Sequence, residues 1–309
     1  MRTTDHTIDA EPRGSERSLM SRLLVGYDGS DAAHAAAAFG LWLAAKADCR
    51  TTLVHVAPDV EAVATAQMLP AFAEQSVANE TAWHRRLENL CEYAADDAAV
   101  DCRVAVGTPA EALIAVAVET AADVVLVGSR GTGRVHGALM GSVSSQLLSH
   151  APCSVMLFRE DRPSWPAADT RAVIVGIDGS PSSRYALELA QSLAVAVRAA
   201  LVLVHAYDEQ VPYMAEPTEP IRAEMRRHAT AIVHEARATI AAPLDVVDQE
   251  IVAGTARGAL IAACERHAPA LLVVGSRGLG GFKELLLGST SRWVANYAPC
   301  PVVVARPRR

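Results

Sequence analysis

The chain has 309 residues and a formal net charge of −7, with 51% hydrophobic and 20% charged residues. This length suits two domains of ordinary size, and the acidic balance argues against nucleic-acid binding, which needs a basic surface for phosphates. Residues 1–20 lack the apolar core of a signal peptide and are expected to form a disordered tail. No uninterrupted apolar run of about 18 residues occurs, so we expect a soluble, cytoplasmic protein without a membrane partner.

The first half of the chain alternates short apolar runs with helical patterns, which is typical of an α/β domain. A strand at 22–26 is followed by an alanine-rich helix at 31–47. The further strands are expected at 51–56, 101–106, 123–127 and 154–158, and the further helices at 72–98, 109–121 and 142–150. Trp83, Leu87 and Leu90 recur at helical spacing within the longest of these helices.

The second half repeats this order after a polar, proline-containing linker at 159–171. Its strands and helices are expected, in chain order, at 172–177, 182–198, 201–206, 219–241, 245–253, 256–267, 270–274, 289–297 and 301–305. We therefore predict two tandem domains, 21–158 and 172–306, each an α/β domain with a doubly wound parallel sheet.

The six cysteines contain no C-x-x-C pair and no zinc-like spacing with histidine. We expect reduced, buried thiols without a redox role. No side-chain metal site is predicted, because the histidines of 219–241 fit an amphipathic helix face.

Two motifs occur twice. Tyr27-Asp28-Gly29-Ser30 returns 150 positions later as Ile177-Asp178-Gly179-Ser180. Gly128-Ser129-Arg130-Gly131, followed after nine residues by Gly141-Ser142, returns 147 positions later as Gly275-Ser276-Arg277-Gly278 and Gly288-Ser289. A duplication that retains strand-end aspartates and glycine loops indicates a repeated binding site.

The motifs follow the first and the fourth expected strand of each half. In a sheet of order 3-2-1-4-5 these two strands flank the crevice in which α/β proteins bind ligands. Glycines let the backbone approach a ligand, and the free N–H groups of the helix opened by Gly141-Ser142 can hold phosphate. Asp28 and Asp178 can accept hydrogen bonds from a ribose or an adenine edge. Turn formation by the glycines, and N-capping by Ser30 and Ser180, are the structural alternatives.

This combination resembles the ATP-binding branch of the universal stress protein family, over nearly all of residues 21–306. The resemblance implies two five-stranded, Rossmann-like domains of the adenine nucleotide alpha hydrolase-like type, in strand order 3-2-1-4-5. It implies one ATP in each domain, with Mg²⁺ held through the phosphates. In the first domain the implied site consists of Tyr27, Asp28, Gly29, Ser30, Val56, Gly128, Arg130, Gly131, Gly141, Ser142, Val143 and Ser144. In the second it consists of Ile177, Asp178, Gly179, Ser180, Ala206, Gly275, Arg277, Gly278, Gly288, Ser289, Thr290 and Ser291.

The resemblance also implies that the last strands, 154–158 and 301–305, pair with each other and make the chain an internal pseudo-dimer. A further homodimer stays open. The two sites are expected to differ in affinity, because Ala206 replaces Val56 and because the nine-residue loops differ, with His136 in the first and Phe282 in the second.

Three functions stay open. The first is a nucleotide-loaded stress-response regulator that acts on an unknown protein partner with little or no hydrolysis. The second is a slow Mg-dependent ATPase or phosphotransferase, and the third is a nucleotide-free scaffold. The absence of a Walker-type loop, a kinase motif or a nucleophile elbow favours the first over the second, and no catalytic residue is predicted. The two intact glycine signatures favour it over the third.

Overall fold

A computed structural model describes residues 19–47, 49–59, 69–92, 99–131, 140–159, 172–208, 218–241, 244, 246–279 and 286–308. The predicted N-terminal tail and linker lie almost wholly outside these ranges. Of the helices that the structure describes, none combines the length and the apolar character needed to cross a membrane.

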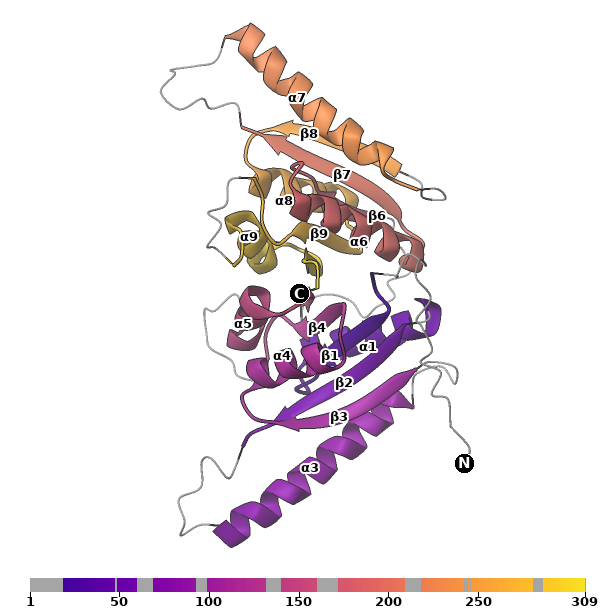
Figure 1. The fold of residues 1–309 in the computed structure, drawn as a ribbon, viewed down its shortest axis with the longest axis vertical. Coiled ribbons are helices and arrows are strands. Elements are labelled where there is room, and N and C mark those ends of the chain that lie inside the picture. Colours follow the sequence, from indigo (N-terminus) through magenta and orange to yellow (C-terminus); the bar gives the residue numbers. More distant parts are fainter. Residues whose placement is uncertain are drawn as a thin grey trace, which may run out of the picture.

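The first half forms the expected alternation of strands and helices (Figure 1). Strands β1 to β5 span Arg22–Gly26, Arg50–Ala57, Val100–Val106, Val124–Gly128 and Ser154–Phe158. Helices α1, α3, α4 and α5 span Asp31–Ala47, Leu69–Cys91, Pro109–Glu119 and Ser142–His150. Helix α4 ends earlier than expected, because Ala121 has a φ of 50°, a left-handed conformation that does not continue a right-handed helix.

The second half repeats the first. Strands β6 to β10 span Ala172–Gly176, Ala200–Tyr207, Val246–Ala253, Leu271–Gly275 and Val302–Ala305. Helices α6 to α9 span Pro181–Val197, Glu219–Ala238, Ala256–His267 and Ser289–Tyr297. The N-caps predicted for Ser30 and Ser180 are confirmed, because Ser30 Oγ accepts a hydrogen bond from Ala33 N at 3.2 Å and Ser180 Oγ accepts one from Ser183 N at 3.1 Å.

The strands form one sheet in the order β3-β2-β1-β4-β5-β10-β9-β6-β7-β8. Each half therefore has the predicted order 3-2-1-4-5, and neighbours within a half are parallel. The two halves meet at β5 and β10, which pair antiparallel with Met156 opposite Val303. The predicted pairing of the last strands is thus confirmed.

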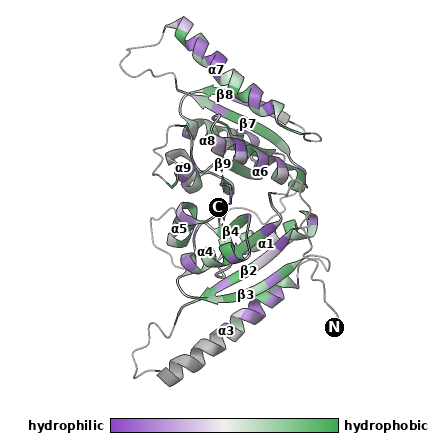
Figure 2. Cartoon of the chain, viewed as in Figure 1, coloured by the Kyte–Doolittle hydropathy of each residue, from purple (hydrophilic) through white to green (hydrophobic). Residues whose placement is uncertain are grey.

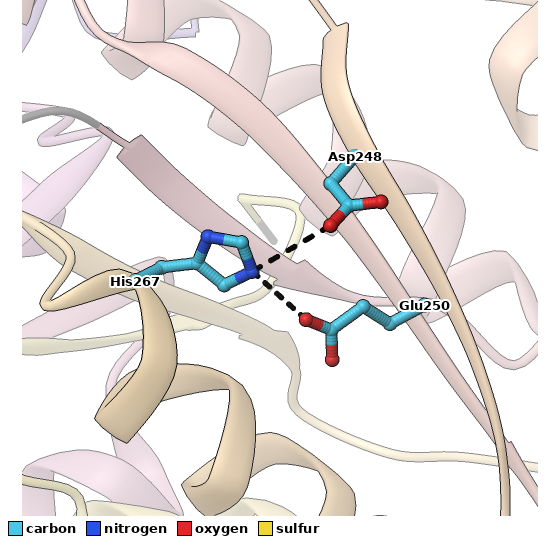
Figure 3. A group of neighbouring side chains, drawn as sticks. All are labelled: Asp248, Glu250 and His267. Carbon is cyan, nitrogen blue, oxygen red and sulfur yellow. Dashed lines mark hydrogen bonds and ion pairs between the residues drawn. The ribbon is translucent and has the colours of Figure 1, made fainter.

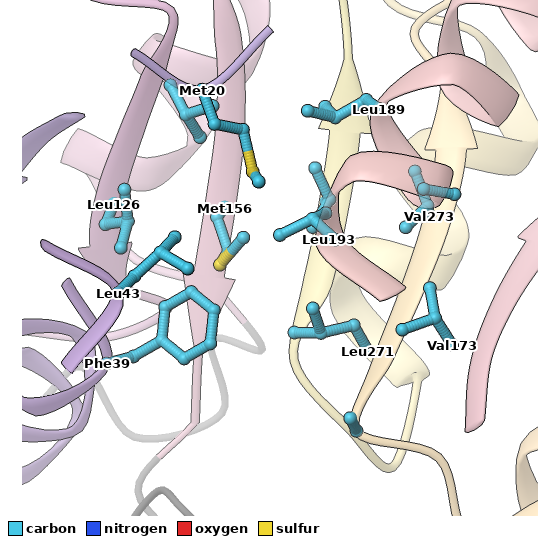
Figure 4. Close-up of a cluster of buried hydrophobic side chains, with 14 of the residues drawn as sticks. Met20, Phe39, Leu43, Leu126, Met156, Val173, Leu189, Leu193, Leu271 and Val273 are labelled. Atoms are coloured by element: carbon cyan, nitrogen blue, oxygen red, sulfur yellow. The ribbon is translucent and has the colours of Figure 1, made fainter. Parts of the chain in front are cut away.

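Helices cover both faces of the sheet. Successive strand residues point to opposite faces, so Val25 packs into one core, with α1 and α3, while Leu24 packs into the other, with α4 and α5. The first core runs through both domains and includes Phe39 and Met156 from one domain and Leu193 from the other (Figure 4). Figure 2 shows mostly hydrophobic strands inside and a largely hydrophilic helix α7 at one end of the molecule.

Two arginines that follow the last strands reach across the junction. The guanidinium of Arg306, which is only 6% exposed, donates to the carbonyls of Leu148, Ala151 and Leu286 at 2.8, 2.8 and 3.0 Å. The first two of these lie at the C-terminal end of α5, where helix carbonyls lack intrahelical partners. Arg159, 147 positions earlier, donates in the same way to the carbonyl of Asn296 in α9 at 2.8 Å. Each domain thus satisfies the end of the other domain's last helix.

The cysteines depart from the expectation that all are reduced. Cys91, at the end of α3, and Cys102, in β3, form a disulfide. Helix α3 packs along β3 and brings these residues together, a contact that motif spacing does not reveal. The remaining four, Cys49, Cys153, Cys264 and Cys300, are free and buried. Burial raises the pKa of the Cys153 thiol to about 12, so this sulfur stays protonated and unreactive.

Candidate functional site

The two repeated motifs of each domain come together at the carboxyl ends of β1 and β4, and of β6 and β9. Gly131 lies so close to Asp28 that a Cβ at residue 131 would collide with the carboxylate. In the second domain a Cβ on Gly278 would lie 2.6 Å from Asp178 Oδ2. Only glycine lets the second loop approach the aspartate this closely. The predicted meeting of the two motifs is therefore confirmed in both halves.

Each aspartate is held in place by the backbone of its own turn. Asp28 Oδ1 accepts a hydrogen bond from Ser30 N at 3.0 Å, and Asp178 Oδ1 accepts one from Ser180 N at 2.9 Å. Gly29 and Gly179 make this turn possible with φ values of 82° and 80°. Asp178 Oδ2 additionally accepts from Leu279 N at 3.1 Å, which ties the aspartate to the second loop. The carboxylates are thus fixed at the edge of each crevice.

The last helix of each domain begins at the same crevice without a side-chain cap. Gly141 and Gly288 occupy the N-cap positions of α5 and α9, and neither helix has a capping side chain. The first N–H groups of a helix lack intrahelical partners and carry a partial positive charge. The N–H groups of Ser142, Val143 and Ser144 accordingly have no hydrogen-bond acceptor among the residues that the structure describes. Such a turn can receive an anionic group.

The serines of this turn differ in what their hydroxyl groups do. The hydroxyl of Ser144 donates to Gly128 O at 2.7 Å, and that of Ser291 donates to Gly275 O at 2.6 Å. Both hydroxyls therefore fasten the helix start to the end of the preceding strand. Ser142 and Ser289 also line the crevices.

A cavity of about 480 Å³ occupies the crevice of the first domain, and one of about 490 Å³ that of the second. Both volumes lie in the range of small-molecule sites, roughly 300–1,000 Å³. All the predicted site residues line these cavities except Gly29, Ser30, Gly179 and Ser180, which shape the turn and cap the following helix. His136 and Phe282, the predicted difference between the loops, lie outside the described residues.

The first cavity has an aromatic wall that sequence inspection missed. Trp83 from α3 stacks on His55 with ring centroids 3.7 Å apart and presents an edge to Tyr27, and all three line the cavity. Ile232 takes the corresponding place in the second domain, beside Gly179 as Trp83 lies beside Gly29, but it does not line that domain's cavity. The two crevices therefore share their polar loops and differ in their apolar walls.

His55 lies in β2 and is buried. Its Nδ1 donates to Tyr27 O at 2.9 Å, and the residue is 8% exposed. Burial lowers the pKa of His55, although the bond to Tyr27 and the charge of Asp28 oppose this shift.

The depressed pKa of His55 predicts a pH dependence of stability. Below the ordinary value of 6.5 the unfolded chain binds a proton at this residue more readily than the folded chain does. The free energy of unfolding is therefore expected to fall as the pH drops from 7.5 to 5.5. We expect His55→Asn to reduce this difference, measured by urea unfolding at both pH values. An unchanged difference would assign the pH dependence to other groups.

A second group of titratable side chains, Asp248, Glu250 and His267, lies away from the crevices on β8 and α8 (Figure 3). Arg266 also pairs with Glu250. Burial alone would raise the pKa of Glu250, but hydrogen bonds from Arg266 and His267 lower it overall. In the first domain Arg103 of β3 and Glu119 form the same strand-to-helix pair with the charges exchanged, at 2.9 Å. We therefore interpret Glu250 and its partners Arg266 and His267 as a structural ion-pair cluster that joins β8 to α8.

Comparison with known proteins identifies the fold and the repeat together. The model of the universal stress protein family matches the chain twice, at residues 20–159 and 170–306. The chain belongs to the universal stress protein family. It is a tandem member, since each match contains one complete set of the Asp and glycine motifs.

The similarity to other universal stress proteins extends over nearly the whole chain. A universal stress protein of Mycobacterium tuberculosis is 32% identical over 293 residues, which cover 92% of this chain and 96% of that relative. Another from the same organism is 34% identical over 319 residues, covering 92% and 94%. The crystal structure of a universal stress protein from Archaeoglobus fulgidus has the same fold, with a TM-score of 0.65 at 21% identity, and covers 94% of this chain and 99% of that one.

Proposed function

We propose that this tandem universal stress protein binds one ATP in each domain and acts in the cytoplasm as a nucleotide-loaded regulator of the stress response. The observation that carries the proposal is the geometry of each crevice. A fixed aspartate, a glycine loop and the uncapped start of a helix surround one cavity of suitable volume.

The polar groups match the parts of a nucleotide. The uncapped turns at Gly141–Ser144 and Gly288–Ser291 can hold phosphate oxygens, because they offer N–H donors at the positive end of a helix dipole. Asp28 and Asp178 can accept hydrogen bonds from the ribose hydroxyls or the adenine amino group. Mg²⁺ would be held mainly by the phosphates, since among the described lining residues of each cavity the aspartate is the single carboxylate.

The apolar walls suggest that the two sites bind the base with unequal strength. Stacking of a base on an aromatic side chain contributes about 1–3 kcal/mol. Trp83 with His55 offers such a surface in the first domain, and none of the described lining residues of the second cavity is aromatic. Val56 in the first domain is larger than Ala206 in the second and would cover more of a base, which also favours the first site. We expect tighter binding in the first domain.

Regulation rather than turnover is favoured by the charges in the crevices. Arg130 and Arg277 are the only cationic side chains among the described lining residues, which include no lysine and no second carboxylate that could orient water. Ligand binding alone can shift a conformation: at 100 times Kd it stabilises the loaded state by about 2.7 kcal/mol. A protein partner could bind selectively to that loaded state.

Nucleotide counting tests the proposal. Mass spectrometry of ligand released from the purified protein is expected to detect ATP, and titration with Mg-ATP to give two sites per chain. Asp28→Ala and Asp178→Ala are each expected to weaken one site by roughly 10- to 100-fold, because each removes charge-assisted hydrogen bonds. The matched variants Asp28→Asn and Asp178→Asn keep the contact to the serine N–H and isolate the effect of charge.

Three outcomes would contradict the proposal or one of its parts. If no adenine nucleotide is released and none binds on titration, the nucleotide-free scaffold is the better description. Unchanged affinities in the alanine variants would refute the role of the aspartates. Phosphate release at a rate that follows ATP occupancy would favour the slow ATPase.

A further inference from the structure

A third cavity lies at the junction of the two domains, beside the crevice of the second domain, with which it shares Ser289. It measures about 590 Å³, and its lining residues include members of α5 from the first domain and of α8 and α9 from the second. Figure 1 shows that α5 and α9 face each other where the two domains meet. We call this third cavity the junction cavity. Ser145 and Ser149 line it from the first domain, and Arg257, Arg292 and Trp293 are prominent among the lining residues of the second.

The charges of the junction cavity are one-sided. Arg257 and Arg292 both line it, and none of its described lining residues is an aspartate or a glutamate. Neither guanidinium has a hydrogen bond or an ion pair within the described part of the chain. In a protein of net charge −7, two arginines that line one cavity and have no acidic partner among the described residues are a local exception. Guanidinium groups present forked donors that fit phosphate oxygens.

The wall beside these arginines is aromatic. Trp293 and Tyr297 of α9 stack with ring centroids 4.6 Å apart and an interplanar angle of 29°. Trp293 is half-buried, while Tyr297 is 49% exposed. A rigid aromatic pair offers a flat apolar surface to the planar part of a ligand at little cost in conformational entropy.

The repeat explains why this cavity exists and why it differs from the crevices. The positions in the first domain that correspond to Arg257, Arg292 and Trp293, 147 residues earlier, are Ala110, Ser145 and Gln146. The facing helix α5 therefore lines the cavity with the small side chains of Ser145 and Ser149, whereas α9 lines it with the larger Arg292 and Trp293. Space stays open between them, and the donors converge on it from one side. The feature is not part of the duplicated fold, so packing of the repeat does not account for it.

We propose that the junction cavity binds a small phosphorylated molecule. Its phosphate or diphosphate group pairs with Arg257 and Arg292, and its planar part packs against Trp293. Its arginines and Trp293 are not among the residues proposed for ATP, although Ser289 lines both this cavity and the crevice of the second domain. A ligand bound here would touch both domains.

Pyrophosphate is a suitable probe, because it carries the charged part of such a ligand alone. In calorimetric titration of the full chain we expect saturable binding that weakens with added salt. The double variant Arg257→Ala/Arg292→Ala is expected to weaken it at least about tenfold, since each arginine contributes charge-assisted hydrogen bonds. Ser145→Glu, which sets a carboxylate on the opposite wall while both arginines remain, is expected to weaken it as well.

The matched control Arg85→Ala/Arg237→Ala removes the same charge from exposed positions on α3 and α7 and is expected to bind pyrophosphate as the unaltered chain does. The proposal is overturned if Arg257→Ala/Arg292→Ala retains full binding, which would assign the anion to the glycine loops. Equal weakening in the control, or no saturable binding at about 10 mM pyrophosphate, would also overturn it. A parallel Mg-ATP titration separates the two proposals, because loss of the junction site leaves the number of bound ATP unchanged.

Discussion

Arg306→Met is expected to lower the free energy of unfolding by about 3 kcal/mol, because it leaves several buried helix carbonyls without a donor. The guanidinium donates to Leu148 and Ala151 at 2.8 Å each, to Leu286 at 3.0 Å and to Ser149 at 3.4 Å. Methionine retains most of the apolar stem but donates no hydrogen bond. For a chain of this size the melting temperature is expected to fall by roughly 6–12 °C, measured by calorimetry.

Two further variants separate the hydrogen bonds of Arg306 from its charge. Arg306→Lys keeps a positive charge near the end of α5, but its single ammonium group cannot donate to all of these carbonyls. We therefore expect its free energy of unfolding to lie between that of the unaltered chain and that of Arg306→Met. Arg237→Met, at an exposed position of α7, is expected to change stability by less than about 0.5 kcal/mol. A melting temperature for Arg306→Met equal to that of this control would mean that other donors satisfy the carbonyls.

Most of the fold could be predicted from the sequence, because its signals are local and repeated. Apolar runs of strand length, each bounded by a helical pattern, occur in the same order in both halves. The prediction of the strand order needed one further inference. The Asp and glycine motifs follow the first and fourth strands, which suggested that these two strands are neighbours. Pairing of β1 with β4, and of β6 with β9, bears that inference out.

The features that were missed all depend on contacts between distant segments. Trp83 fits the apolar face of a helix in the sequence, and only the path of α3 places it on His55. Arg306 stands near the end of the chain like a solvated charge, yet the β5–β10 pairing buries it. The Cys91–Cys102 disulfide likewise depends on how α3 crosses β3. Local sequence patterns carry no information about these approaches.

The glycines of the second motif were predicted to allow close backbone approach. The distances around Gly128 show how little space a side chain would have there. A Cβ on Gly128 would lie 2.8 Å from Ala32 Cβ, 2.9 Å from Arg130 O and 3.0 Å from Ala33 N. These atoms belong to the start of α1 and to the glycine loop itself. A methyl group at residue 128 would overlap with backbone atoms and an alanine Cβ, none of which can move by a side-chain rotation. The backbone around the crevice would therefore have to shift.

We therefore expect Gly128→Ala to have two effects. Overpacking is expected to cost about 1–3 kcal/mol of stability, and displacement of the loop from Asp28 is expected to abolish the ATP site of the first domain. Titration with Mg-ATP would then give one site per chain instead of two. Gly275→Ala is expected to act equally on the second domain, because its Cβ would lie 2.8 Å from the backbone carbonyl of Ser182.

Gly141→Ala is the matched control, since it alters a glycine of the same crevice that has room for a methyl group. Apart from its two chain neighbours, the described residues leave its Cβ no contact shorter than 3.5 Å, and its φ of −71° suits any residue. We expect a loss below about 1 kcal/mol, the ordinary effect of alanine at an N-cap. If Gly128→Ala has the same melting temperature as Gly141→Ala and still binds two ATP, the glycine loop can accommodate the methyl group without moving away from Asp28. Close approach at Gly128 would then not be what forms the site.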